Sequence, residues 1–147
     1  MSLDHRIAAR CVLALLCAIQ GLATPIIDFN RTHATNPNWP GHARFHLVWQ
    51  AISTALLSIL EVALIWWPGR FVEQRFFLAV VITCIPLLAF LIAVIGRVLY
   101  DGTLSDPNGI PPARILVLGR VRRIDLNLAV VTAALLVLAV VVIIYKV

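Results

Sequence analysis

Three histidines beside one hydrophobic run are the residues best suited to chemistry in this chain. His42 and His46 are four residues apart, so on a helix their imidazoles share one face. A helical pair with this spacing can bind one transition metal through both rings, and iron, copper and zinc all accept imidazole and carboxylate ligands. We therefore predict a metal site whose ligands are His33, His42, His46 and Asp28.

The same histidines also suit metal-free acid–base catalysis or a structural role at a membrane interface. In a catalytic site, His42 and His46 need a carboxylate partner, which Asp125 or Asp101 could provide. Asp125 opens the last hydrophobic run, where a carboxylate also suits the helix dipole and can act as a cap. The residues predicted to bind substrate are Trp39, Arg44, Gln50 and Asn127.

The loop that precedes the histidine pair is unusually stiff in composition. Its sequence, NPNWPGHARFH, contains Asn36-Pro37 and Trp39-Pro40-Gly41, both of which favour compact turns. A loop that only joined two helices would not need so many restricted residues. The pattern favours a preorganised site, in which Arg44 pairs with Asp28 or with a lipid phosphate.

Glu61 closes a polar stripe that begins at His42 and runs along one side of the same helix. Fifteen residues separate Glu61 from His46, which is roughly 22 Å along a helix, so the two cannot share one site. Two interpretations remain open. Glu61 is either an interfacial carboxylate, solvated or paired with Arg70 or Arg75, or a proton-carrying or substrate-binding carboxyl inside the bundle.

Composition identifies the class of protein. The chain has 147 residues, 61% hydrophobic and 13% charged, against about 25% charged in a soluble domain. Mean hydropathy is +0.96. We interpret the net charge of +5 as basic residues at the ends of membrane spans, not as a nucleic-acid surface. The three cysteines lie in apolar runs without a C-x-x-C motif and are expected to be free thiols.

Four runs are long enough to span a bilayer as helices. We predict one all-α integral membrane domain over residues 1–147, a four-helix transmembrane bundle. This connectivity places both long loops at one membrane face, where they cap a polar pocket, and the basic residues weakly favour that face as cytoplasmic. The predicted spans cover residues 7–27, 45–67, 76–100 and 124–145.

Local features refine these spans. Pro25 is expected to bend or end the first helix. Arg97 and Asp101, four residues apart, are expected to form an ion pair on the third helix. The apolar segment 115–118 in the last long loop is expected to dip into the membrane interface.

In size, in its four spans and in the polar cluster NPNWPGHARFH, the chain resembles small four-helix bacterial membrane proteins of the DoxX-like and anthrone-oxygenase-like families. That resemblance implies oxidoreductase chemistry on small lipophilic molecules; it carries over no individual residue. We therefore expect a multi-pass protein of the bacterial inner membrane.

The leading prediction is a small membrane enzyme that oxidises or oxygenates a lipophilic molecule, with iron, copper or zinc as the possible cofactor. A metal-free isomerase or cyclase using a His/Asp pair is the second prediction. The third is a non-catalytic subunit or lipid-binding protein, whose histidine-rich loop docks a partner subunit or another copy of the chain.

Overall fold

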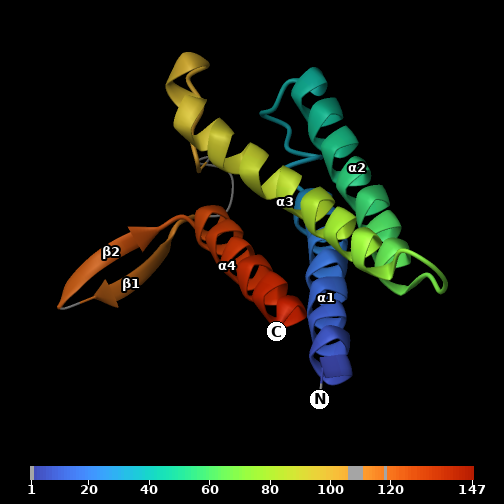
Figure 1. The fold of residues 1–147 in the computed structure, drawn as a ribbon. Coiled ribbons are helices and arrows are strands. Elements are labelled where there is room, and N and C mark those ends of the chain that lie inside the picture. The colour runs from blue at the N-terminus through green and yellow to red at the C-terminus, as the bar shows by residue number, and fades with distance from the viewer. Residues whose placement is uncertain (1, 106–110, 118) are drawn as a thin grey trace.

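Four long helices make up most of the computed structural model. The structure describes residues 2–105, 111–117 and 119–147. All four helices are long and apolar enough to cross a membrane, so the chain is a multi-pass transmembrane bundle (Figure 1). The helices are α1 (Ser2–Asp28), α2 (Gly41–Trp66), α3 (Val72–Gly96) and α4 (Leu126–Lys146).

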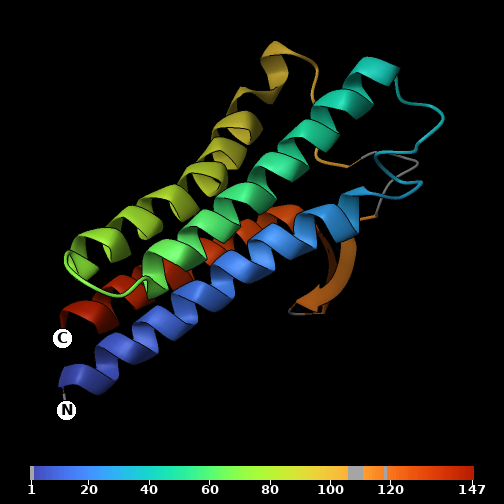
Figure 2. The ribbon, with the colours of Figure 1, turned by 90° about the vertical axis from the view of Figure 1, so that its right-hand side faces the viewer.

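The helices are arranged so that α1 and α3 each pack against both α2 and α4, which lie diagonally across the bundle. Figure 2 shows the N-terminus, the C-terminus and the α2–α3 turn together at one end, called here the terminal end. The two long connections, residues 29–40 and 100–125, lie at the other end, called here the loop end. The predicted sorting of both long loops to one face is confirmed.

The helices extend beyond the predicted spans at several ends. α1 continues through Pro25, because the Phe29 amide still donates to the Pro25 carbonyl at 2.9 Å. α2 begins at Gly41 and α3 at Val72, earlier than predicted, since their first turns contain polar side chains that hydropathy excludes. Pro25 therefore does not end the first helix.

The predicted ion pair between Arg97 and Asp101 does not form. The α-helix ends at Gly96, a 3₁₀ turn follows over Arg97–Leu99, and Asp101 adopts a left-handed φ of 51°. Helical spacing is therefore lost before it reaches Asp101. The Arg97 Nη1 atom instead donates to the Val94 carbonyl at 3.2 Å. Among the residues that the structure describes, the only salt bridge joins Lys146 to Glu73.

The last connection contains a β-hairpin that the sequence analysis did not predict. Strands β1 (Ala113–Val117) and β2 (Arg120–Ile124) pair antiparallel, and Gly119 in the turn has a φ of 73°. Of the segment expected to dip into the membrane, residues 115–117 belong to β1, and residue 118 lies outside the described residues. Figure 1 shows the hairpin pointing sideways from the start of α4.

Buried residues lie in the half of the bundle near the terminal end and in its middle. The core there includes Leu13, Ile65, Phe76 and Tyr145, and the last two rings stack with centroids 3.7 Å apart. Toward the loop end, no helix carries a buried residue over residues 22–28, 41–50, 88–96 or 126–137. The helices separate there, as Figure 1 shows for α2, α3 and α4. These portions of the helices therefore contribute nothing to the buried core.

Candidate functional site

The histidine pair lies on the first turns of α2, at the loop end of the bundle. The Nε2 atoms of His42 and His46 are 3.0 Å apart, and their rings meet nearly at right angles. One ring must donate and the other accept, so the pair shares a single proton between two nitrogens. Both side chains are exposed. The prediction that they share one helix face is confirmed; they are not enclosed in a pocket formed by the loops.

The distance between the two nitrogens fits a shared metal ion. Zinc binds histidine nitrogen at about 2.0–2.1 Å, so two ligands at angles of about 90–110° have nitrogens about 2.9–3.3 Å apart. The Nε2 atoms of His42 and His46 lie within that range. The separation of the two nitrogens therefore matches that of two adjacent ligands of one metal ion.

No third ligand joins the pair in the described part of the chain. The described residues contain no group of three or more His, Cys, Asp or Glu side chains that could hold a metal. His33 packs edge-on against Trp39 at 5.5 Å, and its Nδ1 lies 2.7 Å from the Thr32 hydroxyl. Asp28 is the last residue of α1. His33 and Asp28 stay predicted ligands that the structure does not bring to the pair.

The loop before α2 is built around Asn36, which is 1% exposed. Its side chain donates to the Thr32 carbonyl at 3.2 Å and accepts from the Asn38 amide at 3.0 Å. Because both the donor and the acceptor of this buried amide have hydrogen-bond partners, the side chain stabilises one loop conformation. The sequence analysis expected a stiff loop from its prolines and Trp39, and it did not single out Asn36 as the organising residue.

Aromatic side chains flank the histidine pair. The rings of Phe45 and Trp49 lie 5.9 Å and 5.8 Å from the His46 ring, and both are exposed. Gln50 is exposed on the next turn, whereas Arg44 is half-buried and its Nε atom has no hydrogen-bond partner among the described residues. The predicted pairing of Arg44 with Asp28 is absent from the salt bridges of the described chain.

Asp125 acts as the cap of α4. Its carboxylate accepts a hydrogen bond from the Leu128 amide at 2.9 Å, which satisfies one of the free donors at the helix start. Asn127 is exposed in the first turn of the same helix. Since α4 lies diagonally from α2, the fold does not place these two residues on a helix that packs against the histidine pair.

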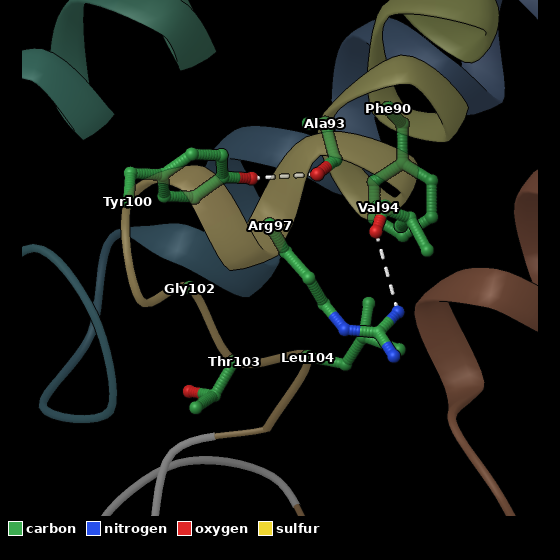
Figure 3. A pocket seen from close by; sticks show the side chains of 8 residues that line it. All are labelled: Phe90, Ala93, Val94, Arg97, Tyr100, Gly102, Thr103 and Leu104. Carbon is green, nitrogen blue, oxygen red and sulfur yellow. Dashed lines mark hydrogen bonds between the residues drawn. The ribbon is translucent and has the colours of Figure 1, made fainter.

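A shallow hollow of about 150 Å³ lies at the end of α3 (Figure 3). Tyr100 folds back beside it, and its hydroxyl donates to the Ala93 carbonyl at 2.7 Å. The lining residues that the structure describes include none of the predicted site residues. The predicted polar pocket is therefore not this hollow.

Glu61 is buried inside the bundle, with only 2% of its surface exposed. It makes no salt bridge with Arg70 or Arg75 in the described chain, and Arg75 donates instead to the Trp67 carbonyl at 2.8 Å. The interpretation of Glu61 as an interfacial carboxylate is wrong. The alternative placement, inside the bundle, is confirmed, while the proton-carrying or substrate-binding role stays a prediction.

Three helices contribute polar side chains to the surroundings of Glu61. Cys17 from α1 and Thr83 from α3 are its polar neighbours, and Ser58 lies one turn before it on α2. Both neighbouring hydroxyl groups donate to backbone carbonyls. Ser58 donates to the Cys17 carbonyl, and Thr83 donates to the Ala79 carbonyl at 2.8 Å. The Cys17 sulfur lies 3.2 Å from the Thr83 oxygen, so the thiol is the donor there. Hydropathy carries no signal that Cys17 and Thr83 lie beside Glu61, because these two residues come from other helices.

Comparison with known proteins adds no relative: no protein-family model, no curated protein and no solved structure matches this chain. The resemblance to DoxX-like and anthrone-oxygenase-like proteins stays a prediction.

Proposed function

We propose that this protein is a small enzyme of the bacterial inner membrane that oxidises or oxygenates a lipophilic molecule, with a transition metal held by His42 and His46. The observation that carries the proposal is the 3.0 Å separation of the two Nε2 atoms, which matches neighbouring ligands of one metal ion. Iron or copper would supply the electron-transfer chemistry that oxidation needs, whereas zinc would polarise a substrate oxygen.

The surroundings of the pair support a lipophilic substrate. Phe45 and Trp49 present exposed rings beside His46 and offer apolar contacts to a molecule at the membrane interface. The helices carry no buried residue toward the loop end, so a lipid-soluble molecule can approach the pair from the bilayer. Gln50, one turn further along α2, offers a hydrogen-bonding group to a polar part of the substrate.

The experiment is a measurement of metal content on the purified protein by mass spectrometry. We expect about one iron, copper or zinc ion per wild-type chain and loss of most of it in both His42→Ala and His46→Ala. His5→Ala is the matched control, since His5 is exposed at the terminal end and should leave the metal content unchanged. Equal metal content in all four proteins would contradict the proposal.

Metal-free acid–base catalysis is the second candidate, and the shared proton between His42 and His46 favours it. A neutral imidazole can work as a general base through its unprotonated nitrogen, and a protonated imidazole beside it as a general acid. A wild-type protein that binds no metal but loses activity in both single variants would support this function. Such a pair would catalyse isomerisation or cyclisation, because neither reaction requires an electron acceptor.

A further inference from the structure

The β-hairpin of residues 113–124 has one face whose described side chains are all exposed. Cross-strand partners share a face, and the register pairs Arg114 with Arg123 and Leu116 with Val121. Because the pairs alternate between faces, these four side chains lie on the same one. Leu116 is 74% exposed and Val121 is 67% exposed, and both arginines are exposed as well. We call this surface the arginine–aliphatic face.

The charges on this face lack any partner in the described chain. Like charges placed directly opposite each other in a hairpin destabilise it, and Arg114 faces Arg123 across the strands. Residues 111–124 contain no acidic residue, and the next one, Asp125, accepts a hydrogen bond at the start of α4. No salt bridge of the described chain involves either arginine. An anion held between the two guanidinium groups would remove the repulsion.

The position of the hairpin puts this face at the membrane surface. β2 ends at Ile124 and the membrane-spanning α4 begins at Leu126, so the hairpin starts at the level where the bilayer ends. It points sideways from α4 (Figure 1). Among the described residues, the hairpin makes no extensive contact with any helix. A two-stranded hairpin without a supporting layer is only marginally stable in water. The lipid headgroup layer beside the bundle would supply a supporting surface.

We propose that the arginine–aliphatic face binds anionic phospholipid headgroups around the loop end. The fork-shaped guanidinium groups of Arg114 and Arg123 would hold a phosphate group between them. Leu116 and Val121, on the same face nearer the turn, would enter the boundary between headgroups and acyl chains. Charge complementarity identifies the lipid, since a zwitterionic headgroup offers no net negative charge to this face.

Hydrogen exchange of the full-length protein in lipid nanodiscs tests this proposal. The hairpin amides should exchange slowly in membranes that contain phosphatidylglycerol and rapidly in pure phosphatidylcholine. Each basic residue near an anionic surface contributes roughly a fivefold factor, so Arg114→Gln with Arg123→Gln should reduce the protection about 25-fold. High salt should weaken protection of the wild-type hairpin.

The same hairpin provides the matched control. Arg120 and Arg122 are exposed on its other face, so Arg120→Gln with Arg122→Gln removes equal charge but should retain most of the protection. Equal exchange in both lipids would overturn the proposal, and so would equal losses in the two double variants. Protection by a soluble polyanion such as RNA in pure phosphatidylcholine, matching that by phosphatidylglycerol, would overturn the lipid assignment. Unchanged helical circular dichroism of each variant shows that the bundle remains folded.

Discussion

At the scale of single residues, local spacing was informative where the interacting groups lie on one helix. His42 and His46 are four residues apart, and that spacing alone predicted their shared helix face, on which the structure places their Nε2 atoms 3.0 Å apart. Glu61 is different, because its neighbours Cys17 and Thr83 come from other helices. Which turns of separate membrane helices meet depends on packing, and hydropathy carries no information on that.

Asp125 illustrates a residue with two predicted roles, a catalytic one and a capping one. As a cap, Asp125→Ala should lower the free energy of unfolding by about 0.5–2 kcal/mol, because the Leu128 amide loses its acceptor. Asp125→Asn should be close to wild type, since asparagine caps as well as aspartate. Thermal unfolding in detergent measures both variants. Destabilisation of Asp125→Asn would contradict the capping role. A stable Asp125→Asn variant without enzymatic activity would show that the carboxylate also has a catalytic role.

At the scale of elements, α1 and α2 approach each other closely where Gly21 meets Ser58. A Cβ atom added at Gly21 would overlap the Ser58 side chain, so the two backbones can approach only because residue 21 is glycine. Small residues at helix contacts are the usual means of packing within a membrane. The contact also orients Ser58, whose hydroxyl donates to the Cys17 carbonyl. The positions of Ser58 and Glu61 thus depend on Gly21.

Gly21→Ala should therefore destabilise the bundle by about 1–3 kcal/mol, the usual cost of overpacking, despite the better helix propensity of alanine. Apparent melting temperature in detergent is the measurement. Gly96→Ala is the control, because no atom lies within 4 Å of a Cβ placed there. In a Ser58→Gly background the cost of Gly21→Ala should disappear, as expected for a pair in direct contact. Additive effects of the two substitutions would contradict the close contact.

The β-hairpin shows why one element was missed. The sequence of residues 113–124 places aliphatic and arginine side chains on both sides of Gly119, which is compatible with two strands and a tight turn. In a chain this hydrophobic, the apolar half of the segment was instead interpreted as a membrane-dipping loop. Gly119 between two short segments compatible with strands, not hydropathy, was the signal for the hairpin.

At the scale of the whole molecule, hydropathy was sufficient for the fold class. Apolar runs long enough to span a bilayer can satisfy their backbone only as helices, and an even number of spans places both termini on one side. The separation of the helices toward the loop end could not be predicted, because lipid-facing and helix-facing residues are equally apolar in a membrane. That separation leaves the histidine pair exposed beside Phe45 and Trp49, where the account places the chemistry.

The central claim is that His42 and His46 jointly bind one metal ion in the folded bundle. X-ray absorption spectroscopy of the metal-loaded protein counts the imidazole ligands directly. We expect two imidazoles in the wild-type and His5→Ala spectra. His42→Ala and His46→Ala lose most of their metal, and any metal that remains bound to them should have one imidazole fewer. A wild-type spectrum without imidazole scattering, or an imidazole count that neither His42→Ala nor His46→Ala changes, would contradict the account.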